Sequence, residues 1–124
     1  MLAHILEDAR LISTLLNLQG DGPVEIYLIT FTDETGRFYI GQHRLPKGQA
    51  EDPEYLGGGR RLNELPKEGR RKHQLLRVPA DWANIVEELL VQKYRQAHKP
   101  QCLNASVSQT KFWQRDGYYA GRRG

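Results

Sequence analysis

Two segments of the chain repeat apolar residues at the spacing of an amphipathic helix. The first pattern starts at Leu2 and stops before a stretch rich in glycine and proline, so we predict a helix over residues 2–18. In the second, Asp81 can cap a helix whose apolar residues share one face and which runs to about Ala97, before Pro100. The first helix is expected either to cover the core or to pair two subunits.

Between these helices the pattern changes to extended segments separated by turns. Residues 24–31 are apolar, β-branched and aromatic, residues 33–36 have the composition of a turn, and residues 37–41 resume the extended pattern. This order predicts a β-hairpin. We also predict a short helix over residues 60–65, stopped by a proline, and a third strand over residues 73–78.

The remaining segments are a loop and a tail around a single domain. Residues 42–59 contain prolines and the triplet Gly57-Gly58-Gly59, which predicts an irregular loop whose backbone amides can approach a ligand. Residues 107–124 form a basic, aromatic tail without clear periodicity. A chain of 124 residues provides one core but not two. The order of elements is that of an α+β domain with an antiparallel hairpin at its centre.

Composition narrows the class of protein. The 18 lysines and arginines against 15 acidic residues give a formal charge of +3, which permits a polyanionic partner without requiring one. The single cysteine, Cys102, excludes a disulfide framework and a multi-cysteine zinc site, and we expect it to be a small core residue. No apolar run has the length of a membrane span, so we expect a cytoplasmic protein without a membrane partner.

Two tyrosines are the first candidates for chemistry. Tyr27 and Tyr39 belong to neighbouring strands of the predicted hairpin, and both phenols can reach one side of the sheet. Strand alternation places Tyr27 on the side opposite Ile26 and Leu28. Taken alone, the pair is also compatible with two half-buried strand tyrosines that serve only packing.

The residues around these tyrosines resemble the paired signature of the GIY-YIG nuclease superfamily. Residues 25–27 read Glu-Ile-Tyr, with glutamate in place of the first glycine, and residues 38–41 read Phe-Tyr-Ile-Gly, which contains the second half in full. Residues 55–62 are similar to the Tyr-x-Gly-Ser-Gly-basic-x-Leu segment of phage-type members. Residues 87–91 and 103–104 resemble the glutamate helix and the closing asparagine of the family.

The resemblance implies a nuclease core over residues 24–106, with a small three-stranded antiparallel sheet flanked by helices, and an extra N-terminal helix outside it. It implies a metal-dependent endonuclease of bacterial or phage origin that hydrolyses DNA. Double-stranded DNA is the favoured substrate. Such chemistry requires a base, a metal on the scissile phosphate and a cation for the developing charge. The expected cofactor is Mg²⁺ or Mn²⁺. A homodimer formed through the N-terminal helix would allow paired sites to cut both strands.

The resemblance also suggests residues for the metal and the surrounding network. Glu87 is the predicted metal ligand, because residues 87–91 fit the Glu-x-x-apolar-apolar pattern of the family better than the frame that begins at Glu88, and Mg²⁺ prefers hard oxygen donors. Glu88 stays open, because both glutamates flank the apolar stripe of their helix, where a solvated carboxylate is the ordinary alternative. Asn104 is expected to hold the site together through hydrogen bonds from its amide, unless it is a turn or capping residue.

Three residues are predicted to activate the attacking water. Tyr27 or Tyr39 would orient or deprotonate it, although a phenol with a pKa of about 10 needs help from the metal or from a base. His43, two residues after the second motif, is the candidate for that help near neutral pH, against the alternative of a solvated loop histidine.

The arginine of the family is the point at which this chain departs from the pattern. In many relatives an arginine follows the second motif, whereas Gln49 occupies that position here. Arg61 is the first candidate to hold the phosphate, with Arg60 and Arg44 as alternatives, although each can equally face solvent. The departure favours a second hypothesis, a non-catalytic nucleic-acid-binding module on the same fold. The residues predicted to contact nucleic acid in either case are Arg44, Arg60, Arg70, Arg71 and Lys72.

Overall fold

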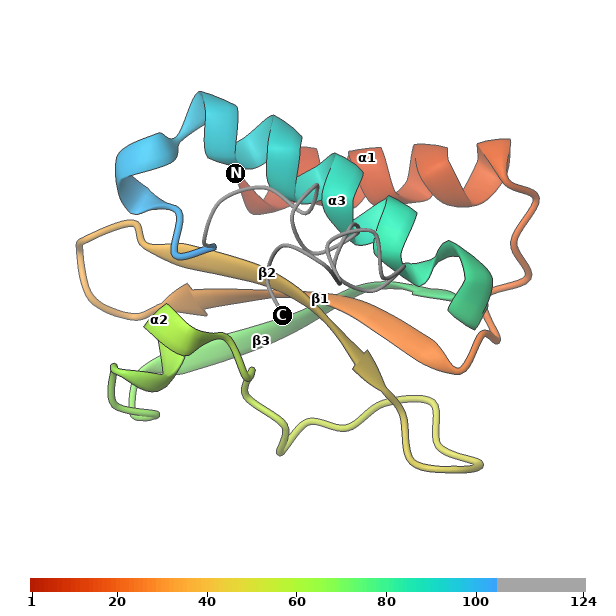
Figure 1. The fold of residues 1–124 in the computed structure, drawn as a ribbon, viewed down its shortest axis with the longest axis horizontal. Helices are drawn as coiled ribbons and strands as arrows, with labels where there is room; N and C mark the ends of the chain where they lie inside the picture. Colours follow the sequence, from red (N-terminus) through yellow and green to blue (C-terminus); the bar gives the residue numbers. More distant parts are fainter. Residues whose placement is uncertain (105–124) are drawn as a thin grey trace, which may run out of the picture.

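The central element of the fold is a three-stranded antiparallel sheet with strand order β2-β1-β3, seen in a computed structural model that describes residues 1–104. Along the chain the elements are α1 (Leu2–Leu15), β1 (Val24–Phe31), β2 (Phe38–Arg44), α2 (Arg60–Asn63), β3 (Arg70–Val78), α3 (Ala80–Ala97) and a 3-10 turn, η1 (Lys99–Gln101). Helices flank the sheet, and one of them is N-terminal (Figure 1). The predicted α+β class and sheet are therefore confirmed.

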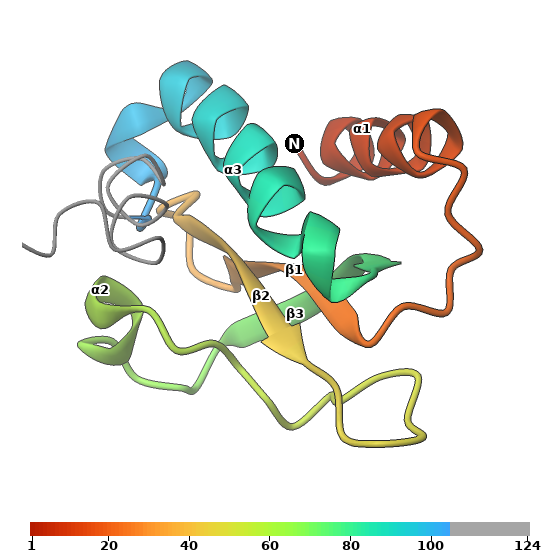
Figure 2. The same ribbon diagram turned by 45° about the vertical axis from the view of Figure 1, so that its right-hand side comes forward.

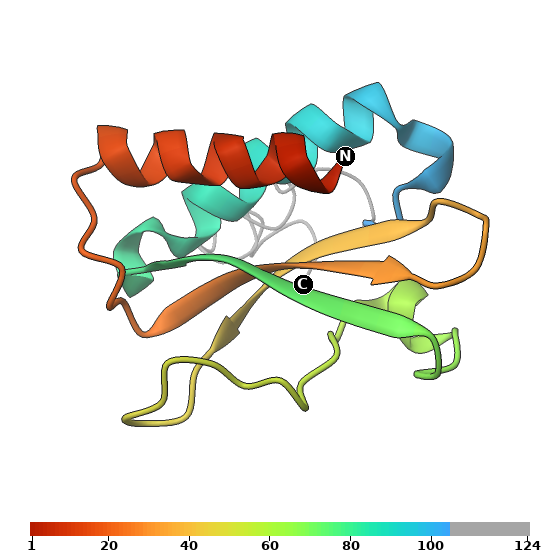
Figure 3. The ribbon, with the colours of Figure 1, turned by 180° about the vertical axis from the view of Figure 1, so that it is seen from behind.

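The two long helices cover one face of the sheet, and α2 with the loop after β2 lies on the other face (Figure 2). Seen from behind, α1 runs along the sheet beside α3 (Figure 3). Asp8 ties the two helices together, since its carboxylate accepts hydrogen bonds from the Tyr94 hydroxyl at 2.5 Å and the Lys93 ammonium at 2.8 Å.

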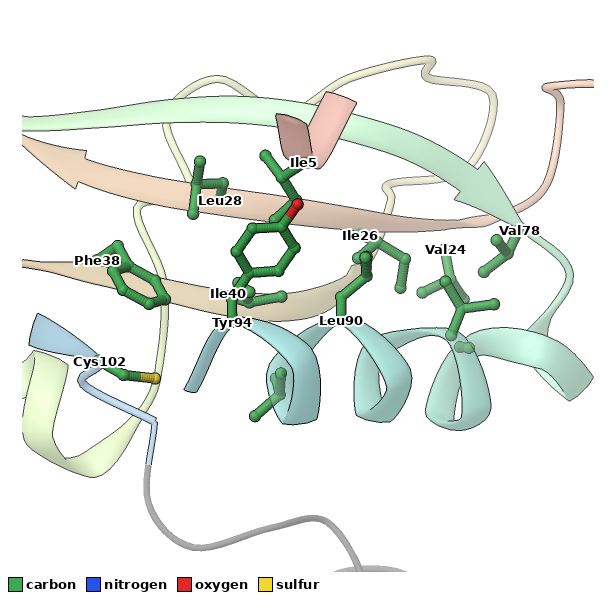
Figure 4. Close-up of a cluster of buried hydrophobic side chains, with 13 residues drawn as sticks. Ile5, Val24, Ile26, Leu28, Phe38, Ile40, Val78, Leu90, Tyr94 and Cys102 are labelled. Atoms are coloured by element: carbon green, nitrogen blue, oxygen red, sulfur yellow. The ribbon is translucent and has the colours of Figure 1, made fainter. Parts of the chain in front are cut away.

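Strand alternation divides the apolar residues into two clusters. Ile26, Leu28 and Ile40 are fully buried and pack toward α3, where Figure 4 shows them beside Leu90 and Tyr94. Other members of this larger cluster are Ile5, Val24, Phe38, Val78, Ala83, Val86, Val91 and Cys102. Its presence there confirms the prediction that the cysteine is a core residue.

The second cluster lies on the opposite face of the sheet. It contains Tyr27 and Ile29 from β1 together with Leu62 and Leu103, all buried. Tyr27 thus lies opposite Ile26, as predicted from strand alternation.

The N-terminal helix is shorter than predicted. It ends at Leu15 rather than at residue 18, because Asn17 adopts a left-handed conformation with φ of 53° that stops the helix. Ile5 and Ala9 are buried, so α1 covers the core. Leu11 and Leu15 are 57% and 73% exposed, and pairing of two copies through this helix stays a prediction.

The third strand begins three residues earlier than predicted, at Arg70 instead of residue 73. The basic run of residues 70–72 pairs with Phe31, Thr30 and Ile29 of the central strand, so charged residues join the sheet. β2 extends to Arg44, three residues beyond its predicted end, and α2 stops at Asn63, two residues before residue 65.

In residues 1–104 no helix is both long and apolar enough to cross a membrane. The predicted tail over residues 107–124, and the last two residues of the predicted 24–106 core, lie outside the described residues.

Candidate active site

Three tyrosines gather on the face of the sheet that α1 and α3 do not cover. Tyr27 and Tyr39 come from β1 and β2, where Tyr27 pairs with Gly41 and Tyr39 with Ile29, so the two rings are diagonal neighbours with centroids 6.3 Å apart. Tyr55, from the loop after β2, meets the Tyr27 ring edge-on at 5.8 Å. The structure therefore brings both predicted tyrosines to one place and adds a third phenol.

Two glycines make room for these rings. A Cβ atom on Gly41 would overlap the Tyr27 hydroxyl, and a Cβ on Gly59 would lie 2.5 Å from a ring carbon of Tyr39. The glycine of the second motif is thus required by close packing against a motif tyrosine. The close approach of Gly59 also brings the start of α2, with Arg60, beside the Tyr39 ring.

His43 is held at the rim of this cluster by two contacts. Its Nε2 lies 2.9 Å from a carboxylate oxygen of Asp52, and its ring stacks on Tyr55 with centroids 3.6 Å apart and planes 4° from parallel. Asp52 did not emerge from the sequence, because it lies in an irregular loop where no periodicity or motif fixes which side chain turns back to the sheet. The structure therefore supplies an acidic partner for the predicted histidine.

Glu87, on α3, is 5% exposed. The amide nitrogen of Gln42 donates to its Oε1 at 2.7 Å and to Asn84 Oδ1 at 2.6 Å. The negative charge of Glu87 contributes to the raised pKa of both Tyr27 and Tyr39. Glu87 is buried and bonded to Gln42, whereas Glu88 is half-buried, which distinguishes the two glutamates that helical spacing left equivalent.

The phenols of the cluster stay protonated at neutral pH. Burial raises the pKa of Tyr39 to about 12, and the negative charge of Glu87 adds to the rise. Burial and the neighbouring Tyr39 raise the pKa of Tyr27 still further. Neither hydroxyl is therefore a free base near neutral pH, but both can donate hydrogen bonds.

The raised pKa of Tyr39 predicts a loss of stability in alkali. Its folded pKa of about 12 exceeds the value of about 10 for an unfolded phenol. The contribution of protonated Tyr39 to the free energy of unfolding is therefore complete below about pH 10. It is lost between about pH 10 and 12, where the free energy of unfolding falls by about 1.4 kcal/mol per pH unit for one phenol. Urea unfolding across this range should show that Tyr39→Phe flattens the decline, and an unchanged slope in that variant would contradict the assignment.

Asn104 is buried and fixes the backbone of β2. Its amide nitrogen donates to the Ile40 carbonyl at 2.7 Å, and its oxygen accepts from the Ile40 N–H at 3.0 Å. The Leu103 N–H donates to the Phe38 carbonyl at 2.8 Å. Asn104 thus makes the predicted amide hydrogen bonds, but it makes them to the main chain between Tyr39 and Gly41 and not to the phenols.

Arg70 requires a correction. We predicted that it contacts nucleic acid, but its side chain is buried and its guanidinium donates to four main-chain carbonyls. The acceptors are Pro66 at 3.2 Å, Leu56 at 2.8 Å, Leu62 at 2.6 Å and Leu65 at 2.8 Å. These bonds hold α2 and the loop before it against the sheet, so Arg70 has a structural role.

Lys72 requires the same correction. Its ammonium is paired with Glu25, and the side chains are 7% and 0% exposed. The ammonium also donates to the Asp52 carbonyl at 2.7 Å and lies 5.4 Å and 5.3 Å from the ring centroids of Tyr27 and Tyr55. Gln74 donates to the same glutamate at 2.9 Å. Lys72 is therefore an internal counter-charge and not a surface contact for nucleic acid.

The other predicted cations face outward. Arg44, Arg60, Arg61 and Arg71 are all exposed. Arg60 and Arg61 begin α2 directly after Gly59, which packs against the Tyr39 ring, so both are candidates for a phosphate contact near the tyrosines.

The oxygen donors near the tyrosines limit the kind of metal site that can form. Across residues 1–104 there is no group of three or more histidine, cysteine, aspartate or glutamate side chains placed to hold an ion. An enclosed site made of protein ligands does not fit this donor set. A Mg²⁺ or Mn²⁺ ion held by the Glu87 carboxylate, waters and a substrate phosphate does fit, because Mg²⁺ commonly takes only one or two carboxylates.

The function of this site is inferred from its geometry alone. Neither the family models, nor the curated proteins, nor the solved structures contain a match to this chain.

Proposed function

We propose that this protein is a metal-dependent endonuclease that hydrolyses phosphodiester bonds of DNA. The observation that supports it best is the gathering of two phenols and a histidine–carboxylate pair on one face of the sheet, with a nearly buried glutamate, Glu87, whose charge acts on both phenols. Packing alone does not explain a carboxylate on α3 close to Tyr27 and Tyr39. A base, a metal ligand and hydrogen-bond donors are the groups that phosphodiester hydrolysis requires.

His43 is the proposed proton acceptor. A carboxylate can only accept a hydrogen bond, so Asp52 places the ring proton on Nε2 and leaves Nδ1 as the basic nitrogen. The stacking on Tyr55 fixes the plane of the ring. Tyr39, protonated and half-buried, would orient the attacking water or the phosphate by donating a hydrogen bond, and the fully buried Tyr27 packs beside its ring.

Glu87 is the proposed ligand of Mg²⁺ or Mn²⁺. A bound ion would supply Lewis-acid stabilisation of charge on the phosphate. The Gln42 amide holds the carboxylate in place by donating to it at 2.7 Å. Arg61, with Arg60 as the alternative, would approach a phosphate from α2.

One observation favours the second candidate, a nucleic-acid-binding module without catalysis. Lys72, the basic residue of β3 that lies against the tyrosine rings, is paired with Glu25, and the guanidinium of Arg70 is engaged with main-chain carbonyls. The cation that would meet charge on the phosphate must then come from the exposed residues of α2. If that contact does not form, the surface can bind a phosphate backbone without cutting it.

Cleavage of supercoiled plasmid and of single-stranded DNA tests the proposal. We expect nicking or linearisation that requires Mg²⁺ or Mn²⁺ and stops when EDTA removes the metal. His43→Gln should lower the rate by about 10²-fold to 10⁴-fold, the usual contribution of a general base. The matched control is His4→Gln, an exposed histidine on α1. Salt-sensitive binding with no cutting of either substrate would support the binding module.

A further inference from the structure

We propose that a basic pocket at the far end of the sheet from α2 binds the phosphate backbone of duplex DNA about five base pairs from the tyrosine cluster. This inference rests on the proposed function for the nature of the ligand. It adds a second contact surface, which would set the position of the duplex on the protein. None of its three cations, Arg44, Lys47 and Arg77, has a part in the chemistry proposed above.

The pocket is a cavity of about 760 Å³ where β2 and β3 end and β1 begins. Arg44 contributes from the end of β2, Lys47 from the loop that follows, and Arg77 from the end of β3. In Figure 1 these strand ends lie together, at the opposite end of the sheet from α2. The pocket and the start of α2 therefore lie at opposite ends of the sheet.

The walls of the pocket are held by main-chain hydrogen bonds. The Leu45 N–H donates to the Pro23 carbonyl at 2.8 Å, which joins the end of β2 to the segment before β1. The Gln49 N–H donates to the Pro46 carbonyl at 2.9 Å, which closes the turn that carries Lys47. The cations are thus presented by backbone that is already fixed, and fixed contacts lose less entropy on binding.

The charge of the pocket favours an anion. The three cations face one carboxylate, Asp21, which leaves a formal charge of +2. In the part of the chain that the structure describes, none of the three cations belongs to an ion pair. The Arg77 guanidinium donates to the carbonyls of Gly22 at 2.9 Å and Asp21 at 3.3 Å, so its orientation is set before any ligand arrives.

The chemistry of the lining points to a backbone phosphate and not to a base. Proline, leucine, glycine, glutamine and alanine supply the uncharged part of the wall, and no aromatic ring of residues 1–104 lines it. Bases of single strands are held mainly by stacking on aromatic side chains, whereas phosphates are held by arginine and lysine. The pocket therefore fits the phosphates of a duplex better than an unpaired nucleotide.

The spacing along β2 sets the expected position on the duplex. Arg44 follows Tyr39 by five residues on the same strand, which spans roughly 17 Å at the rise of an extended chain. Successive base pairs of B-DNA are about 3.4 Å apart, so this length corresponds to about five base pairs. Arg77 pairs with Glu25 on the tyrosine face, so a duplex lying along β2 on that face would contact the tyrosine cluster and the Arg77 side of the pocket at once.

Binding of mixed-sequence duplexes, measured by fluorescence anisotropy with EDTA and no added metal, tests the proposal. The pocket variant is Arg44→Gln/Lys47→Gln, which changes two exposed residues and leaves the structural bonds of Arg77 intact. The matched control is Arg10→Gln/Lys99→Gln, two exposed cations on the helical side that carry the same change in charge.

The pocket variant should bind a duplex of about 16 base pairs at least about 10-fold more weakly than the wild type, with a salt slope smaller by about 1 to 2. Equal losses in the two variants, no loss in the pocket variant, or no binding of duplex DNA by the wild type would overturn the proposal.

The outcome is separable from that of the cleavage test. Wild-type protein that binds duplex through the pocket but never cuts plasmid would sustain this inference and refute the nuclease. Metal-dependent cutting together with full affinity of the pocket variant would refute this inference and sustain the nuclease.

Discussion

Replacing Glu87 with glutamine is expected to abolish metal-dependent DNA cleavage and to leave DNA binding unchanged. The amide keeps the size of the side chain and an oxygen that can accept the hydrogen bond from Gln42, but it loses the charge that a divalent cation requires. We expect the cleavage rate to fall by about 10³-fold or more, which corresponds to about 4 kcal/mol of transition-state stabilisation. Plasmid nicking at saturating Mn²⁺ measures the rate, and anisotropy in EDTA measures binding.

Glu88→Gln is the matched control for this prediction. It makes the same chemical change one residue further along α3, on a side chain that is only half-buried. An activity of Glu87→Gln within about 10-fold of the wild type would contradict the assignment of the metal ligand. A second readout does not depend on activity, since removal of the Glu87 charge should lower the pKa of Tyr39 in an ultraviolet titration of the phenols.

Local patterns predicted the parts of the site that depend on strand geometry. Alternation along β1 and a turn of defined length are sufficient to place Tyr27 and Tyr39 on one face, and both lie there. The helical repeat of α3 could not separate Glu87 from Glu88, because both flank the same apolar stripe. Only the packing of α3 against β2, which brings Gln42 to Glu87, separates them. That contact joins residues 45 positions apart, and no local pattern encodes it.

The errors in the sequence analysis have a common physical cause. A basic run is typical of a solvated surface, so Arg70 and Lys72 were predicted to contact nucleic acid. In the fold their strand pairs with the central strand β1, and both side chains reach the buried face. Each charge then requires a partner inside the protein, and each has one, main-chain carbonyls for Arg70 and a carboxylate for Lys72. Sequence alone shows the charge but not the compensation.

Glu25 is explained by the same reasoning. The GIY-YIG pattern has a glycine at this position, and a glutamate there would place a charge on the tyrosine face of a buried strand. Lys72 lies on β3, the edge strand on the other side of β1 from Tyr39, and its ammonium neutralises the Glu25 carboxylate directly. Gln74 donates a hydrogen bond to the second oxygen of that carboxylate. Lys72 also bonds to the Asp52 carbonyl, and Gln74 bonds to the Ala50 carbonyl at 3.0 Å. The departure from the motif therefore anchors the loop that carries the partner of His43.

Removal of Lys72 alone is the second change with a large expected effect. Lys72→Met keeps the length of the side chain but leaves the Glu25 charge buried without a counter-ion, and breaking one side of a buried pair typically costs about 3–5 kcal/mol. Urea unfolding measures the loss of unfolding free energy. An unchanged dependence of that free energy on urea concentration is the evidence that only stability has changed. Arg71→Met is the matched control, an exposed cation on the same strand, for which we expect a change within about 0.5 kcal/mol.

The double variant Glu25→Leu/Lys72→Met decides between a lost ion pair and lost packing. If the cost of Lys72→Met comes from the unpaired carboxylate, removal of that carboxylate should restore most of the stability, because apolar replacement of a whole buried pair is often neutral. Additive losses in the two single variants, or a cost of Lys72→Met below about 1 kcal/mol, would show that the pair behaves like a surface salt bridge. The recovered double variant should still cut DNA more slowly than the wild type. It lacks the hydrogen bond from Lys72 to the Asp52 carbonyl, so the loop that places Asp52 beside His43 is no longer anchored.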